Sequence, residues 1–161
     1  MRFSICGDYI PIRELDMTTA PEGVRIANLE CAFADAAVSS GKAYTSVLPF
    51  DAASEENIGR FAALSVANNH VCDAGDPAAQ LARLERKFPE VRFFGTVGRP
   101  YAEFECDGAK IAFIGCLERC RSRGRLIFRE EDVLPLLKKL RGAFDRVYVC
   151  PHWGKESEYT R

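Results

Sequence analysis

The chain has 161 residues, of which 47% are hydrophobic, and it carries 22 basic and 23 acidic side chains. Length and apolar content of this order predict a single folded domain over residues 1–161 rather than a disordered tail. The balanced charge provides no basic field, so we expect no nucleic-acid partner. No apolar run reaches the ~18 residues of a membrane span and no signal-peptide pattern opens the chain, which predicts a cytoplasmic protein without a membrane anchor.

Short runs rich in β-branched and aromatic residues alternate with helical patterns along the chain. The expected strands cover residues 2–6, 24–30, 63–68, 91–95, 102–106, 110–116 and 146–150. Strands that alternate with helices predict an α/β fold with a largely parallel sheet. Asp107-Gly108 separates two of the strands and is typical of a type I′ hairpin turn, so we expect a mixed sheet.

Three segments have the end signals of helices. The first covers 53–62, with Ser54 as a candidate N-cap, and the second covers 76–88, with Asp76 at the cap position. The third covers 130–141, with acidic residues leading and basic residues closing it. Pro135 lies inside this last pattern, which predicts either a kink or a helix that starts nearby.

The seven cysteines form no CxxC pair. Cys116 and Cys120 are four residues apart, but no second pair completes a tetrahedral site. The pattern argues against a structural zinc site and favours a reducing compartment.

Polar clusters follow four of the expected strands. They are Gly7-Asp8, Asn28-Leu29-Glu30, Asn68-Asn69-His70 and the His152 segment. Each alone could be a turn, a helix cap or a solvated strand end. Because the carboxyl ends of parallel strands meet at one edge of a sheet, we expect these clusters to converge. The alternative would require the same polar pattern to arise by chance at four separate strand ends.

The side chains in these clusters offer oxygen and imidazole donors without a thiolate. Such a set suits Mn²⁺, Fe or Zn²⁺ in a hydrolytic site. Hydrolysis benefits from a metal because it lowers the pKa of bound water, and two ions can clamp the attacking and leaving oxygens.

The motifs resemble a known family. GD (7–8), NLE (28–30), ANNHxxDxG (67–75) and HWGxE (152–156) occur in the order found in bacterial capsule-synthesis proteins, the CapA-like branch of the calcineurin-like metallophosphoesterases. These proteins are associated with poly-γ-glutamate capsules. The resemblance covers nearly the whole chain and implies a four-layered α/β/β/α sandwich. It also implies two divalent metal ions at the sheet edge.

The resemblance also implies roles for individual residues. Five would be metal ligands, with the amide at 28 the weakest candidate: Asp8, Asn28, Glu30, Asn69 and His152. His70 would lie beside the leaving group as electrostatic stabiliser or general acid. Asp73 would orient the His70 imidazole.

Two departures from the family pattern bear on these expectations. The family continues to a GHHPH-like motif, whereas His70 and His152 are the only histidines here, so the resemblance predicts either a truncated domain or weak metal binding. Ser157 stands where the family usually has a tyrosine after Glu156.

Arginines recur at every second position in the segment 119–125. In an extended segment Arg119, Arg121 and Arg123 would point the same way and could bind phosphate or a polycarboxylate such as polyglutamate. The alternative, a solvated loop, is slightly favoured.

Together these observations favour a metal-dependent hydrolase of the phosphoesterase type with a small-molecule or polymeric anionic substrate. A binding or accessory protein with an incomplete metal site is the first alternative. The second is an interaction module with capsule-synthesis partners at the membrane, which the lack of an anchor argues against.

Overall fold

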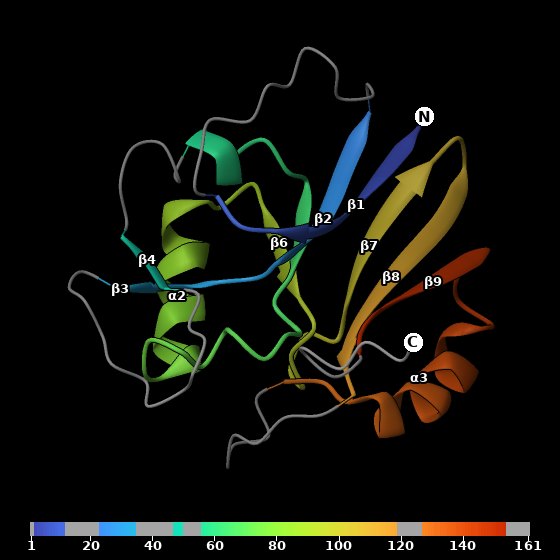
Figure 1. The fold of residues 1–161 in the computed structure, drawn as a ribbon. Coiled ribbons are helices and arrows are strands. Elements are labelled where there is room, and N and C mark those ends of the chain that lie inside the picture. Colours follow the sequence, from blue (N-terminus) through green and yellow to red (C-terminus); the bar gives the residue numbers. More distant parts are fainter. Residues whose placement is uncertain (1, 12–22, 35–46, 50–55, 119–126, 154–161) are drawn as a thin grey trace, which may run out of the picture.

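A computed structural model describes residues 2–11, 23–34, 47–49, 56–118 and 127–153. Two β-sheets pack face to face, with helix α2 on one outer side and helix α3 on the other (Figure 1). The α/β class and the four-layered arrangement expected from the sequence are therefore confirmed.

The first sheet has four parallel strands. In spatial order they are β1 (Phe3–Tyr9), β2 (Val24–Leu29), β5 (Ala63–Ser65) and β6 (Arg92–Phe94). All four carboxyl ends lie at the same edge of this sheet, which is where ligands collect in open parallel sheets.

The second sheet has three strands: β7 (Tyr101–Cys106), β8 (Ala109–Leu117) and β9 (Arg146–His152). β7 and β8 are antiparallel, while β8 and β9 are parallel. Asp107 and Gly108 join β7 to β8 with φ angles of 51° and 77°, as a type I′ turn requires, so the predicted hairpin is confirmed. The sequence predicted one mixed sheet, whereas the structure has an all-parallel first sheet and a mixed second sheet.

The helices begin close to the predicted signals. α2 (Pro77–Lys87) starts after Asp76, whose carboxylate accepts a hydrogen bond from the Ala78 amide. The 3₁₀ turn η1 (Glu130–Asp132) leads into α3 (Val133–Leu140). Pro135 lies in the first turn of α3, where its missing N–H costs no intrahelical hydrogen bond. Of the two predicted outcomes, a kink or a helix that starts nearby, the structure shows the second.

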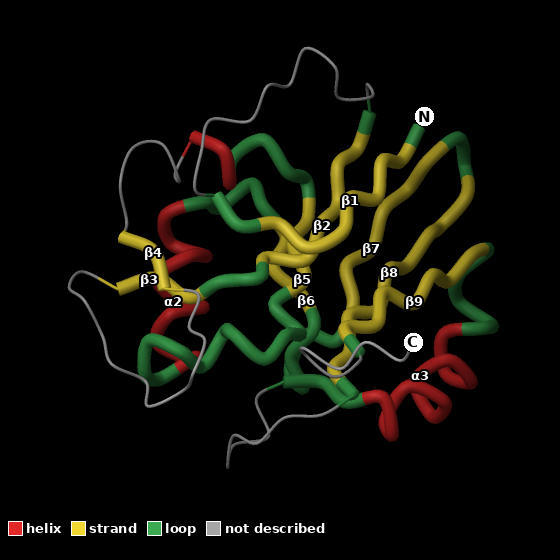
Figure 2. Tube along the Cα trace, in the orientation of Figure 1, coloured by secondary structure: helices red, strands yellow, loops and turns green. Residues whose placement is uncertain are grey.

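The predicted helix over 53–62 is only partly described, because Ser54 lies outside the described residues. Residues 56–58 are helical, and the chain turns before β5. A short parallel pair, β3 (Ala32–Ala34) and β4 (Val47–Pro49), lies near α2 (Figure 2), and the side-chain oxygen of Gln80 in α2 accepts a hydrogen bond from the amide of Phe33 in β3.

Three hydrophobic clusters fill the spaces between the layers. Leu64 and Phe93 pack on the α2 side of the parallel sheet, and Phe94 and Phe113 fill the space between the two sheets. A third cluster, which includes Ile114, joins the second sheet to α3. Successive strand residues thus face opposite layers, as the two-residue period of a strand dictates.

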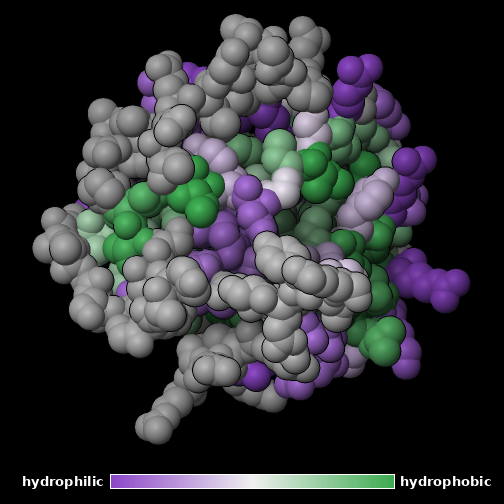
Figure 3. All heavy atoms as spheres, viewed as in Figure 1, coloured by the Kyte–Doolittle hydropathy of each residue, from purple (hydrophilic) through white to green (hydrophobic). Residues whose placement is uncertain are grey.

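The outer strands expose apolar side chains. Ile5 on β1 is 56% exposed, Tyr148 and Val149 on β9 are each 39% exposed, and Trp153 is 70% exposed. In the space-filling view, hydrophilic side chains gather near the centre of the face, with hydrophobic areas to either side (Figure 3). None of the described helices is both long enough and apolar enough to cross a membrane.

Replacing Asp76 with alanine should destabilise the fold by about 1 kcal/mol, because the first turn of α2 loses its side-chain acceptor. Urea unfolding measures this change. Asp132→Ala is the matched control, because Asp132 precedes α3 without making a capping hydrogen bond. Equal losses in the two variants would show that the Asp76 cap contributes nothing.

Candidate metal centre

A β-bulge places Asp8 at the carboxyl end of the parallel sheet. Between Ile5 and Asp8, β1 advances three residues while its partner β2 advances two, from Ile26 to Asn28. Cys6 and Gly7 thus form the irregular step, and Asp8 pairs directly with Asn28. Bulges commonly redirect a side chain next to a functional site, and glycine within a strand pattern is their sequence signal.

The end of β2 and the turn after β5 supply the next polar groups. Glu30 follows β2 directly and is buried. Asn68 is fully buried and accepts hydrogen bonds from the amides of His70 and Val71, which closes the turn that carries Asn69 and His70. Asn68 Nδ2 also donates to the Leu29 carbonyl oxygen, which holds the turn against the end of β2.

His152 comes from the second sheet. It is the last residue of β9 and reaches the ends of the first-sheet strands because the two sheets approach closely beside it. Gly95 and Gly115 allow this approach: a Cβ atom at Gly115 would lie 2.5 Å from Ser65 Oγ and 3.2 Å from Gly95 Cα. Gly95 also has a φ of 95°, which side chains rarely adopt.

Asp8, Glu30 and His152 form a compact cluster. One potential ligand atom from each lies within 4.8 Å of the others. His152 Nδ1 is 3.5 Å from Asp8 Oδ1, and its Nε2 is 3.3 Å from Glu30 Oε1. Asn69 Oδ1 joins the same group at 2.8 Å from His152 Nε2. These four side chains come from four separate segments of the chain.

The cluster is costly to leave without a cation. Burial raises the pKa of the Glu30 carboxyl above its ordinary value, and the Asp8 carboxylate raises it further. His152, His70 and the Asn28 amide act in the opposite direction but do not outweigh burial. Carboxylate, amide oxygen and imidazole donors are the groups that divalent transition metals bind, so the residues present fit such an ion.

A second pair of side chains lies beside the cluster. His70 Nδ1 is 2.6 Å from Asp73 Oδ2, and Asp73 is fully buried. His70 Nε2 points toward the cluster at 3.7 Å from Glu30 Oε1. A buried carboxylate in this position fixes the orientation of the imidazole.

A profile of the family described as bacterial capsule synthesis protein PGA_cap matches residues 9–161. The chain belongs to the PGA_cap family. The matched region includes Glu30, Asn69, His70 and His152, while Asp8 precedes it by one residue. No curated protein matches the chain.

A solved structure shares the fold of this PGA_cap chain. It is of a protein described as a 5′-nucleotidase from Staphylococcus aureus, in complex with alpha-ketoglutarate. The sequences are 15% identical and the TM-score is 0.58, over 97% of this chain and 38% of that one. The chain therefore spans well under half the length of that protein, and the likeness shows a metallophosphoesterase-like fold.

The residues that the sequence singled out lie together in this PGA_cap chain. All the expected ligands and the expected catalytic pair are within one polar group at the carboxyl edge of the first sheet: Asp8, Asn28, Glu30, Asn69, His152, His70 and Asp73. Arg119, Arg121 and Arg123 lie outside the described residues. The sequence did not predict the hydrogen bonds of Asn68, and its position directly before Asn69 and His70 was the only indication of a role.

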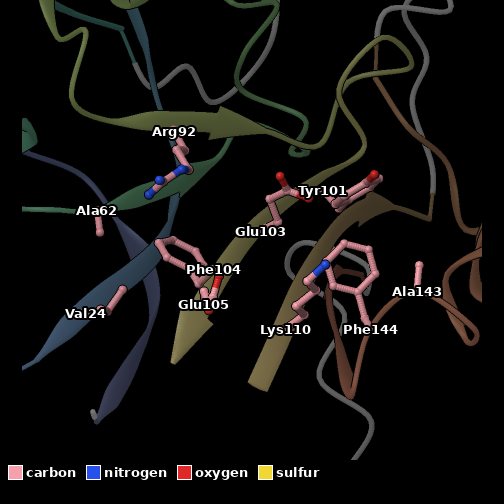
Figure 4. Close-up of a pocket in the computed structure, with 10 residues that line it drawn as sticks. All are labelled: Val24, Ala62, Arg92, Tyr101, Glu103, Phe104, Glu105, Lys110, Ala143 and Phe144. Carbon is pink, nitrogen blue, oxygen red and sulfur yellow. The ribbon is translucent and has the colours of Figure 1, made fainter. Parts of the chain in front are cut away.

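An open groove of about 810 Å³ lies at the opposite edge of the parallel sheet (Figure 4). Val24 and Arg92 at the amino ends of β2 and β6 line it, with Phe104 of β7 under the Arg92 guanidinium at 4.7 Å. Glu105 and Lys110 from the hairpin bring both signs of charge to it. The groove contains none of the residues of the candidate metal centre.

Proposed function

We propose that this PGA_cap chain is a metal-dependent hydrolase of the phosphoesterase type, acting in the cytoplasm on a small or polymeric anionic substrate of capsule synthesis. The observation that carries the proposal is the convergence of Asp8, Glu30, Asn69 and His152 beside the His70–Asp73 pair. A folded protein gains nothing in stability from placing the Asp8 carboxylate beside the buried Glu30 carboxylate, whereas a metal site needs both acids.

In this proposal four side chains hold two divalent ions, Mn²⁺, Fe or Zn²⁺: Asp8, Glu30, Asn69 and His152. A bound ion would supply a water of lowered pKa as the nucleophile. Glu30 and Asp8 provide the negative charge that attracts the cation. Asn69 adds a neutral oxygen and also orients the His152 imidazole through its 2.8 Å contact.

His70 has the geometry of a proton donor to the leaving oxygen. Its Nδ1 contacts Asp73 Oδ2, and its Nε2 faces the metal cluster at 3.7 Å from Glu30 Oε1. Asp73 holds the imidazole in the orientation that this role requires. Substrate recognition by Arg119, Arg121 and Arg123, through guanidinium contacts to phosphate or carboxylate groups, also belongs to the proposal.

A binding or accessory role in polyglutamate-type capsule synthesis, together with capsule-synthesis partners, is the second candidate. It is favoured by the composition of the cluster, in which His152 is the one imidazole ligand among the described residues. In that role the same ligands would bind metal without turnover.

An assay with Mn²⁺ separates the two candidates. We expect hydrolysis of p-nitrophenyl phosphate or bis-p-nitrophenyl phosphate by the full chain, and a loss of about 100-fold or more in kcat for His70→Ala. Asp73→Asn should reduce kcat less, with KM unchanged, because it acts on the orientation of His70.

The matched control is Lys110→Ala in the distant groove, which should leave the rate unchanged. Mn²⁺ binding without hydrolysis by the wild type would support the accessory role. Equal rates for the wild type and His70→Ala would exclude His70 as the proton donor.

A further inference from the structure

We propose that Asn28 is a positioning residue and not a metal ligand: its side-chain amide group, held by Asn68, donates hydrogen bonds to the Asp8 and Glu30 carboxylates. The inference refines the proposed metal centre and rests on it for its functional meaning. Backbone amide and carbonyl groups, whose donor and acceptor roles are unambiguous, fix the orientation of both side-chain amides.

The orientation of the Asn68 amide is fixed by the backbone. Its Oδ1 lies 3.0 Å from the His70 amide nitrogen and 2.9 Å from that of Val71, and both of these groups can only donate. Its Nδ2 lies 2.7 Å from the Leu29 carbonyl oxygen, which can only accept. Asn68 is fully buried, so no solvent competes for these contacts.

Asn68 in turn orients Asn28. The second contact of Asn68 Nδ2 is to Asn28 at 3.2 Å, and a donor there requires the oxygen of Asn28, not its nitrogen. The Nδ2 of Asn28 therefore faces the other way. It lies 2.8 Å from Asp8 Oδ1, 2.5 Å from Glu30 Oε2 and 3.2 Å from His152 Nδ1.

The opposite orientation of Asn28 is unfavourable on both sides. It would bring its oxygen against the two carboxylates and its nitrogen against the nitrogen of Asn68. Because an uncharged amide nitrogen carries two hydrogens and binds no metal, Asn28 serves the site by donating. The two shortest contacts are to Asp8 and Glu30, so the two hydrogens hold these carboxylates side by side.

The arrangement makes a relay from the turn after β5 to the ends of β1 and β2. Asn68 ties the turn that carries Asn69 and His70 to the same amide that aligns Asp8 and Glu30. The spacing of groups from three segments is thus set by one hydrogen-bonded chain. Partners of this kind commonly change metal affinity by about 10–100-fold when they are removed.

A double-mutant cycle on Mn²⁺ affinity tests the relay. Asn68→Ser keeps an oxygen that can accept from the amides of His70 and Val71 but loses the donor to Asn28. We expect Asn68→Ser to weaken Mn²⁺ binding about tenfold in the wild-type background and less than about twofold in the Asn28→Ala background. Calorimetric titration of the full chain gives both numbers, and equal losses in both backgrounds would overturn the relay.

A crystal structure with Mn²⁺ located by its anomalous scattering tests the ligand assignment. We expect Asn28 to keep its oxygen on Asn68 and to stay outside coordination distance of the ion. Its oxygen at about 2.2 Å from the ion would overturn the inference.

Melting curves in EDTA test the relay without any ion. Asn28→Ala and Asn68→Ser together should lower Tm by less than the sum of the single losses, and additive losses would count against the relay. A wild type that binds no Mn²⁺ would refute the metal centre. The melting temperatures of the single and double variants would still show whether Asn28 and Asn68 are coupled. Bound Mn²⁺ without hydrolysis would refute only the enzymatic role.

Discussion

Replacing Glu30 with glutamine should abolish divalent-metal binding and also raise the melting temperature of the metal-free protein at neutral pH. Glutamine keeps the shape of the side chain and an oxygen that can accept from Asn28. It removes a buried negative charge that lies close to Asp8. Metal affinity and metal-free stability should therefore change in opposite directions.

The pH dependence of the stability gain follows from the pKa of Glu30. Burial raises it above its ordinary value of 4.5, so the folded protein holds this proton more tightly than the unfolded chain does. Glu30 therefore costs folding free energy as the pH rises above 4.5, and the cost reaches its full size above the pKa of Glu30 in the folded state. The gain from glutamine should be present there and disappear as the pH falls to about 4.5 or below.

Melting curves in EDTA from about pH 4 to pH 8, together with calorimetric titration of Mn²⁺, measure both effects. Glu103→Gln on β7, which is exposed and distant from the cluster, is the control and should change neither quantity. A Glu30→Gln protein that melts lower than the wild type at neutral pH would mean that the attraction of His152 and His70 outweighs burial.

Local sequence signals predicted several elements of the fold. Asp107-Gly108 has the chemistry of its turn, and Asp76 has the chemistry of its cap, so both were predictable from a few neighbouring residues. The polar residues at the carboxyl ends of β1 and β2 and after β5 could be assigned to one edge, because parallel strands end on the same side. These predictions needed no knowledge of which strand lies beside which.

The division into two sheets could not be read from the strand patterns. His152 was expected at the same sheet edge as Asp8, but β9 pairs with β8 in the second sheet and reaches Asp8 across the gap between sheets. Strand pairing is decided by packing between distant segments, and the alternation of side chains in β9 fits either sheet. Gly95 and Gly115 mark the place where the two sheets approach closely, but this role is visible only from their contacts in the structure.

The direction of a side-chain amide is a further property that sequence does not contain. Asn28 and Asn69 have the same side-chain donors and acceptors; Asn28 lies near the end of β2, and Asn69 lies in the turn after β5. Asn69 turns its oxygen to His152, whereas Asn28 turns its nitrogen to the carboxylates because Asn68 occupies its other side. The residue type predicted that both asparagines belong to the site, and their neighbouring hydrogen bonds decide whether each one accepts or donates there.

The close approach of the two sheets makes Gly115 a sensitive position for both stability and metal binding. In Gly115→Ala the new methyl group would lie 2.5 Å from Ser65 Oγ and 3.2 Å from Phe94 Cε2, inside a packed interface. We expect a loss of about 1–3 kcal/mol in unfolding free energy. Because Gly115 pairs with Cys150 two residues before His152, separating the sheets should also move His152 from Glu30 and weaken Mn²⁺ binding.

Ser65→Ala in the same chain distinguishes this steric cause from others. It removes the nearest obstructing atom, so the double variant Gly115→Ala/Ser65→Ala should recover part of both losses relative to Gly115→Ala. Gly98→Ala is the matched control, since a Cβ there meets nothing within 4 Å, and it should leave both quantities unchanged. If Gly115→Ala lowered stability but kept wild-type Mn²⁺ affinity, the position of His152 would not depend on the distance between the sheets. Urea unfolding and calorimetric titration are compared for the wild type, Gly115→Ala, the double variant and Gly98→Ala. Steric separation of the sheets predicts that the losses of unfolding free energy and of Mn²⁺ affinity rise and fall together.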